Sequence, residues 1–173
     1  LLRILWDTIL MLQIRQTVSF RKWLIRLEDR TAKARLVRRF ERLADGHAGD
    51  HRFLGAANDR AIGVHAMNRP SRTQSVRTVP FDAAEYLADE ETQLAYLNTA
   101  LAEGDAQAMV TALGTVARAR GMSRVAKRCG LGRESLYKAL SDSGNPAFTT
   151  IVGVASALGY TFEMRAAPAK RTG

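Results

Sequence analysis

Apolar residues recur every three or four positions through most of the second half of the chain, which predicts a cluster of helices. Asp82 and Glu85 are spaced as a capping box and predict a helix start before Tyr86 and Leu87. The next helix is marked by Leu94, Leu97 and Leu101 and ends at Gly104. A third is expected from an Asp105 cap to about Gly121, with its apolar side on Met109, Val110, Leu113, Val116 and Ala117.

Residues 122–140, MSRVAKRCGLGRESLYKAL, fit two short helices and a tight turn, the pattern of a helix-turn-helix. Gly130 is expected to form the bend and Leu131 to fill the core behind it. The inward positions are Val125, Ala126, Cys129, Leu136, Ala139 and Leu140. The outward positions of the second helix are Arg133, Glu134, Tyr137 and Lys138. Their donors and aromatic ring suit base edges and phosphates in a major groove.

A final helix is predicted after Asn145 and Pro146, which supply a cap and a first-turn proline, and Gly159 ends it. Its expected apolar residues are Phe148, Ile151, Val152, Ala155 and Leu158. Beyond it Tyr160, Phe162 and Met164 alternate with polar residues, so a short strand or an extended arm is expected there. Tyr86 and Tyr96 are interpreted as core or interface aromatics.

The first part of the chain has a different pattern. A short strand over 13–17 precedes helical spacing of Phe20, Trp23, Leu24 and Leu27. A basic helix is expected over 31–44, ending at Gly46. Its apolar side is Leu36, Val37, Phe40, Leu43 and Ala44, and its cationic side is Arg35, Arg38, Arg39 and Arg42.

Residues 47–79 have neither helical nor alternating period and mark a domain boundary. Within them a polar basic arm, NRPSRTQSVRT, follows Met67. The apolar start, residues 1–10, is interrupted by charges, and no run approaches a membrane span. We expect those ten residues to be a leader, either translated in frame from upstream or beginning at an alternative start codon.

The charge is basic overall and unevenly distributed. The 173 residues carry a formal charge of +9, which favours nucleic acid or an acidic partner. Residues 78–116 contain acids but no lysine or arginine, whereas residues 118–140 are rich in both. The basic density therefore coincides with the predicted helix-turn-helix. With 46% apolar residues, the chain is long enough for one ordinary domain or two small ones.

Two stretches carry a family resemblance. Residues 78–164, with TVPFDAAEYL, AYLNTALAEGD, GRESLYKAL and GNPAF in order, resemble HigA-type addiction-module antidote proteins with a Cro/lambda-repressor-like domain. Residues 11–54 resemble the opening of the partner, a RelE/HigB-like toxin, and the match then stops. The strands that carry messenger-RNA cleavage in that family are not recognisable after Leu54.

The expected fold class is therefore mainly α, a lambda-repressor-like bundle preceded by a truncated strand-helix-helix fragment. The expected domains are a toxin fragment over 1–54, a linker over 55–77, the antidote domain over 78–165 and a tail over 166–173. Four apolar residues of the fragment lack the sheet that would cover them, and they need another cover. These are Phe20, Trp23, Leu27 and Phe40.

The resemblance implies a cytoplasmic, dimeric, DNA-binding antitoxin that represses its own operon and binds a RelE/HigB-like toxin. Arg133 is the preferred base reader. The expected DNA-binding residues are Arg133, Glu134, Ser135, Tyr137, Lys138, Arg124, Lys127 and Arg128. Arg118 and Arg120 are expected on phosphates. Gly132 takes the N-cap of the second helix, where the family often has serine.

Two other functions stay open. One is an interaction module without specific DNA binding, in which acids from Asp82 to Asp105, Glu90 and Glu91 among them, meet a basic toxin. The other is an RNA-cleaving toxin, against which the missing catalytic region argues. We expect no enzyme activity, cofactor or metal. Cys129 is the only cysteine and is interpreted as a core residue, and His47, His51 and His65 lack companions at metal-ligand spacing.

Overall fold

The structure, a computed structural model, describes residues 13–44 and 77–164, and the fold over these residues is mainly helical. The expected mainly α fold class is confirmed at that level. Several predicted features lie outside the described residues: the leader, the 166–173 tail, all of the linker but its last residue, the helix stop at Gly46 and the three histidines. No helix within 13–44 or 77–164 is both long and apolar enough to cross a membrane.

The described chain forms two compact units. Of the described residues, the first unit contains 13–27, 39–44 and 77–82, and the second contains 28–38 and 83–164. Helix α3 (Arg30–Ala44) contributes its first part to the second unit and its last part to the first.

The first unit holds a two-stranded antiparallel sheet. Strand β1 (Arg15–Thr17) pairs with β2 (Thr78–Pro80), with Gln16 opposite Val79. Helix α2 (Val18–Arg26) follows β1 directly, because the Thr17 hydroxyl accepts a hydrogen bond from the Phe20 amide and caps it. The strand and the two helices predicted here are therefore present.

Aromatic rings cover part of the apolar side of α2 and α3. Phe20 lies 5.4 Å from Trp23 and 5.6 Å from Phe40 between ring centroids, and Phe40 lies 5.6 Å from Phe81. Phe81 comes just after β2, so residues far along the sequence complete this cluster. Trp23 remains 50% exposed, which shows that the cover is partial.

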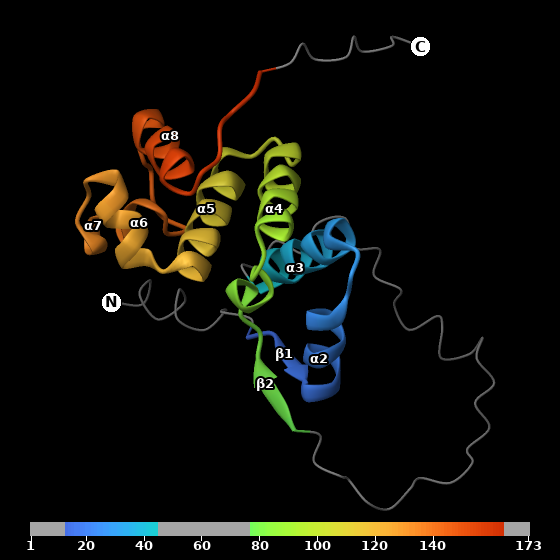
Figure 1. Cartoon of the computed structure of the whole chain (residues 1–173). Helices are drawn as coiled ribbons and strands as arrows, with labels where there is room; N and C mark the ends of the chain where they lie inside the picture. The colour runs from blue at the N-terminus through green and yellow to red at the C-terminus, as the bar shows by residue number, and fades with distance from the viewer. Residues whose placement is uncertain (1–12, 45–76, 165–173) are drawn as a thin grey trace, which may run out of the picture. The chain divides into compact units, whose positions relative to one another are not determined.

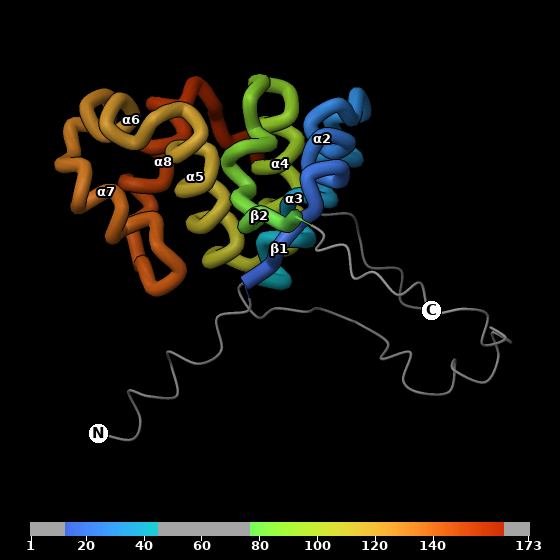
Figure 2. The backbone as a smooth tube through the Cα atoms, turned by 90° about the horizontal axis from the view of Figure 1, so that it is seen from below, coloured from blue at the N-terminus to red at the C-terminus, as the bar shows by residue number. Residues whose placement is uncertain are grey.

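The second unit is built around α5 (Ala106–Arg120). This helix contacts the 3₁₀ turn η2 (Ala83–Tyr86), α4 (Glu90–Ala102), α6 (Met122–Cys129) and α8 (Phe148–Ala157), and Figures 1 and 2 show it in the middle of them. Its central role explains why nine of its residues are buried. The predicted Asp105 cap is confirmed, since its carboxylate accepts from the Gln107 amide. Tyr86 and Tyr96 are buried, as expected of core aromatics.

Two predicted helix starts are wrong. The helix expected from Asp82 is only a 3₁₀ turn, and the long helix begins at Glu90 under an Asp89 cap. The last helix has Ala147 as its N-cap, so Asn145 and Pro146 lie before it. In both cases a polar residue has the chemistry of a helix start, but packing places the start a few residues further on. Of the two forms expected for Tyr160 to Met164, a short strand or an extended arm, the structure has the extended arm, without a strand partner among the described residues.

The apolar side predicted for the last helix is also wrong in part. Phe148 is 71% exposed and Val152 is exposed, whereas Ala155 and Leu158 are buried as expected. The buried side includes Val154 and Ala157 instead. The prediction of a helix is correct, but its buried side is not the side that carries the largest apolar residues. The side that packs against α5 and α6 is rotated away from it.

Candidate nucleic-acid interface

Two short helices, α6 (Met122–Cys129) and α7 (Arg133–Ala139), are joined by Gly130, Leu131 and Gly132. Gly130 has φ +68°, in the left-handed region that glycine adopts without a steric penalty. Its amide and the Leu131 amide donate to carbonyls of the last turn of α6 and end that helix. The predicted bend therefore lies at Gly130.

The inward side of this pair is apolar. Val125, Ala126, Leu136 and Leu140 are at most 5% exposed, and the predicted inward residues Cys129 and Ala139 are half-buried. α6 contacts α5, α7 and α8, so these side chains anchor the pair to the rest of the unit. Leu131 does not fill the core as predicted, because it is 37% exposed in the turn.

All eight predicted DNA-binding residues lie on the exposed side of α6 or α7. α6 carries Arg124, Lys127 and Arg128, and α7 carries Arg133, Glu134, Ser135, Tyr137 and Lys138. Five of the eight are basic and one is acidic, so the exposed side is strongly cationic. Such a surface attracts phosphates and offers donors to base edges.

Arg133 and Tyr137 are coupled on that surface. The Arg133 guanidinium carbon lies 5.5 Å from the centroid of the Tyr137 ring, one helical turn away. A cation over an aromatic face is attracted by the ring, by about 0.5–1 kcal/mol at an exposed site. The contact restricts Arg133, the residue expected to read bases, to fewer conformations.

Arg124 is held from the preceding helix. Its guanidinium donates hydrogen bonds to the carbonyl of Arg120, which is the last residue of α5. A cation near the carboxyl end of a helix is favoured by the helix dipole. Arg124 therefore links the first turn of α6 to the last residue of α5, and its side chain remains exposed.

Arg120, one of the arginines expected on phosphates, is half-buried and forms hydrogen bonds within the second unit. Its guanidinium donates to Gln93 Oε1 at 2.6 Å, to Glu90 Oε1 at 3.0 Å and to the Tyr160 hydroxyl at 3.0 Å. Burial tends to lower the pKa of Arg120, but Glu90 and Tyr160 outweigh it and raise that pKa. Arg120 therefore has a structural role that ties α4, α5 and the C-terminal arm together.

Cys129 is turned toward α8. Its Sγ lies 3.7 Å from the Gly153 carbonyl oxygen. Burial raises the pKa of the Cys129 thiol, and the nearby Arg128 opposes this only in part. The thiol is therefore protonated at neutral pH, as suits a packing residue.

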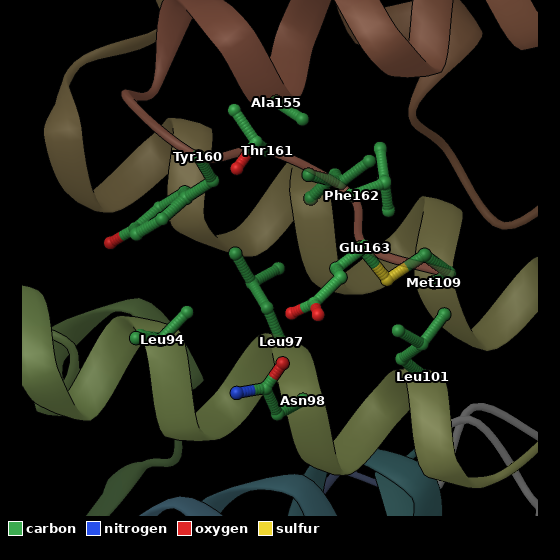
Figure 3. Close-up of a pocket in the computed structure, with 11 residues that line it drawn as sticks. Leu94, Leu97, Asn98, Leu101, Met109, Ala155, Tyr160, Thr161, Phe162 and Glu163 are labelled. Carbon is green, nitrogen blue, oxygen red and sulfur yellow. The ribbon is translucent and has the colours of Figure 1, made fainter. Parts of the chain in front are cut away.

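A hollow of about 430 Å³ lies between α4, α5, α8 and the C-terminal arm. Leu97 from α4 and Glu163 from the arm point into it, and Phe162 and Met109 stand on the opposite side from α4 (Figure 3). Its lining is mixed, because the half-exposed Leu94 and Leu101 stand beside the polar Asn98, Thr161 and Glu163. Sequence patterning missed it, because it depends on how the arm returns along α4.

Sequence patterning also missed the ion pairs of the second unit. Arg30 pairs with Asp89 and Glu91, and Arg38 pairs with Glu103. The sequence shows acids without arginines in 78–116 and several arginines in 30–42. This separation was the only indication of the ion pairs. Within residues 13–44 and 77–164 no group of histidine, cysteine or acidic residues is arranged to hold a metal ion.

Comparison with known proteins identifies the family. The family model described as "Probable addiction module antidote protein" matches residues 77–166. An uncharacterized protein of Haemophilus influenzae is 47% identical over 85 residues, which cover 49% of this chain and 88% of that protein. No solved structure matches the chain. The matched residues contain the α6–α7 pair and all eight exposed residues described above, and the chain belongs to the family of probable addiction module antidote proteins.

Proposed function

We propose that this antidote-family protein is a HigA-type antitoxin that binds operator DNA through a helix-turn-helix formed by α6 and α7, and that it represses its own operon. One observation carries the proposal: the pair is anchored by buried Val125, Ala126, Leu136 and Leu140, while its basic side chains are all exposed. An apolar inner side and a cationic outer side are what a rigid DNA-reading module requires.

The residues divide into two roles. On α7, Arg133 and Lys138 donate to base edges, with Glu134, Ser135 and Tyr137 beside them. On α6, Arg124, Lys127 and Arg128 contact phosphates and set the register. The contact of Arg133 with Tyr137 supports Arg133 as the main reader, because an oriented guanidinium loses less conformational freedom on binding.

Two partners complete the proposal. A second copy of the chain reads the other half-site, since one short recognition helix reads too few base pairs and paired half-sites lie about one DNA turn apart. A RelE/HigB-like toxin is bound directly by the antitoxin. The antidote family supports a toxin partner.

The toxin-like segment 1–54 is proposed to be a fused remnant, followed by the 55–77 linker and the 78–165 antidote domain. Its Phe40 ring packs against Phe81 from the start of the antidote segment, and its Phe20 ring packs against Phe40. This cover replaces the sheet of a complete toxin and supports a structural role for the segment. Family membership favours a regulatory role over RNA cleavage.

A gel-shift titration on the DNA upstream of the coding region, which is expected to contain an inverted repeat, tests DNA binding. Arg133→Ala and Lys138→Ala should each weaken binding by about 5- to 150-fold, because a lost base or phosphate contact removes about 1–3 kcal/mol. Arg26→Ala, which removes an exposed arginine at the end of α2, is the matched control and should leave affinity within about twofold.

Two results would overturn the DNA-binding proposal. One is equal binding to the upstream DNA and to shuffled DNA of the same composition. The other is an equal effect of Arg133→Ala and Arg26→Ala. Either result would favour an interaction module without specific DNA binding.

A further inference from the structure

Within the second unit, the first part of α3 pairs with acidic residues of α4 and of its two cap positions, Asp89 and Glu103. The Arg30 Nε is 3.2 Å from Asp89 Oδ1 and 2.6 Å from Glu91 Oε2. Arg38 Nε lies 3.1 Å from Glu103 Oε1, and its Nη2 lies 3.2 Å from Oε2. We call Asp89, Glu91 and Glu103 the acidic edge of α4.

The Arg38–Glu103 pair is specific rather than a chance surface contact. The Arg38 side chain is only 4% exposed and that of Glu103 only 16%. Charged side chains are rarely buried unless they are paired, and the two parallel hydrogen bonds match the guanidinium fork to the carboxylate. The acidic edge therefore recognises an arginine with defined geometry.

The contact between these two helices is nevertheless incomplete. Ala34 and Val37 of α3 are fully buried, but a hollow of about 460 Å³ is lined by other residues of α3 and by α4. Its lining includes Thr31 and Arg35 from α3 and Leu94, Asn98 and Ala102 from α4. The pairs of Arg30 are exposed and contribute little free energy. Residues 28–38 therefore contact the acidic edge but leave part of the surface between the two helices uncovered.

We propose that the acidic edge of α4 is the docking surface for an arginine-bearing amphipathic helix of the partner toxin, and that residues 28–38 of this chain occupy it in cis. The inference rests on the proposed antitoxin function. It adds the surface that binds the toxin and the segment of this chain that competes for that surface. Residues 28–38 show which features a docking helix needs. These are two arginines eight residues apart, with small apolar residues such as Ala34 and Val37 between them on the buried side. A toxin helix docks only after it displaces this segment.

Charge reversal in the full-length chain tests the displacement. The probe is a fluorescent peptide of residues 28–44, followed by fluorescence anisotropy. In Arg30→Glu/Arg38→Glu, the new carboxylates repel the acidic edge and release the segment, so the peptide should bind at least about tenfold more tightly than to the unmodified chain.

Two further variants separate specific docking from general charge attraction. Arg26→Glu/Arg39→Glu makes the same change in net charge at two exposed arginines and should leave peptide affinity within about twofold. Adding Glu91→Arg and Glu103→Arg to the first variant restores the ion pairs with reversed polarity. That variant should bind the peptide no better than the unmodified chain does.

Equal gains in the first variant and its control, or tight peptide binding by the polarity-reversed variant, would overturn the proposal. If Arg38→Glu prevents folding, Arg30→Glu alone carries the test, with an expected gain of about two- to fivefold and no gain counting against docking. The unmodified chain is also titrated with operator DNA. Absence of DNA binding by the unmodified chain, with the peptide results intact, would refute the DNA-binding function and leave the docking surface in place.

Discussion

Arg120 and Tyr160 meet in two ways, since the Arg120 guanidinium donates to the Tyr160 hydroxyl at 3.0 Å and lies 5.5 Å from the centroid of its ring. The hydroxyl also donates to the Glu90 carbonyl and to Gln93 Oε1. The first residue of the C-terminal arm is therefore attached to both α4 and α5. Burial raises the pKa of Tyr160, and although Arg120 opposes this, Glu90 and Asp89 add to it, so the hydroxyl keeps its proton at neutral pH.

The first prediction removes only that hydroxyl. Tyr160→Phe should lower the free energy of unfolding by about 1 kcal/mol, because Gln93 and Arg120 lose a partner in a partly buried cluster. Urea denaturation measures the change. Operator affinity should stay the same, since the Tyr160 hydroxyl bonds to residues of α4 and α5 and not to the exposed residues of α6 and α7.

Tyr137→Phe is the matched control, because Tyr137 is 41% exposed on α7. Tyr137→Phe also removes one hydroxyl, and it should change the free energy of unfolding by less than about 0.5 kcal/mol. A loss at Tyr137 equal to that at Tyr160 would show that the cluster adds no stability.

The second prediction concerns the close approach of α5 to the end of α7. A Cβ at Gly114 would lie 2.7 Å from the Leu140 carbonyl oxygen and 3.2 Å from the Leu140 Cβ. Gly114→Ala must move backbone atoms, so it should destabilise the protein by about 1–3 kcal/mol despite the better helix propensity of alanine. It should also weaken operator binding, because α7 is displaced. Thermal unfolding and the gel-shift titration measure the two effects.

Gly153 in α8 provides the opposite case. A Cβ there meets nothing within 4 Å, so Gly153→Ala should stabilise the protein by about 0.5–1 kcal/mol. If both alanine variants were stabilised alike, the close packing of α5 on Leu140 would not constrain the protein.

The elements predicted best from the sequence are those whose ends are set by local chemistry. Asp105 caps α5, and Gly130 ends α6, because a carboxylate near a free amide and a left-handed glycine act within a few residues. The exposed positions of α7 followed from the helical period alone. Asp89 was missed as a cap because Asp82 offers the same chemistry seven residues earlier. The choice between them depends on packing, including the hydrogen bond that the Gln93 side-chain Nε2 donates to the Leu87 carbonyl.

The candidate site divides in the same way. Its eight exposed residues could be predicted, since exposure on a short helix follows from which side is apolar. The role of Arg120 could not, because its partners Glu90 and Tyr160 are 30 and 40 residues away in the sequence. The pairing of Arg38 with Glu103 spans 65 residues. Such contacts depend on how helices pack, which periodicity does not specify.

The third prediction concerns the start of α7. Gly132 is its N-cap, with φ −67° and ψ 144° and without a side-chain capping bond. Serine adopts these angles freely, and its hydroxyl would accept from an amide of the first turn. Gly132→Ser should therefore stabilise the protein by a few tenths of a kcal/mol. A shift in the urea midpoint measures it.

Gly130→Ala, two residues earlier, is the control for that prediction. Its φ of +68° is unfavourable for alanine, so this variant should lose about 1–2 kcal/mol. The prediction fails if serine at 132 destabilises the protein.

The last prediction concerns acid stability through Asp89. Burial acts to raise the pKa of this carboxyl, but hydrogen bonds from the Thr92 amide and hydroxyl and the charge of Arg30 outweigh it and lower the pKa. The unfolded chain therefore takes up the proton at a higher pH than the folded protein does. The stabilisation by the Asp89 carboxylate is complete above the ordinary aspartate pKa of about 3.9 and is lost as the pH falls through the lower folded value.

Asp89→Asn keeps a capping oxygen but cannot titrate, so the free energy of unfolding of this variant should fall less steeply below about pH 4. Urea denaturation at a series of pH values measures the slope. Equal slopes for Asp89→Asn and the unmodified protein would show that the Asp89 carboxylate does not link folding to pH.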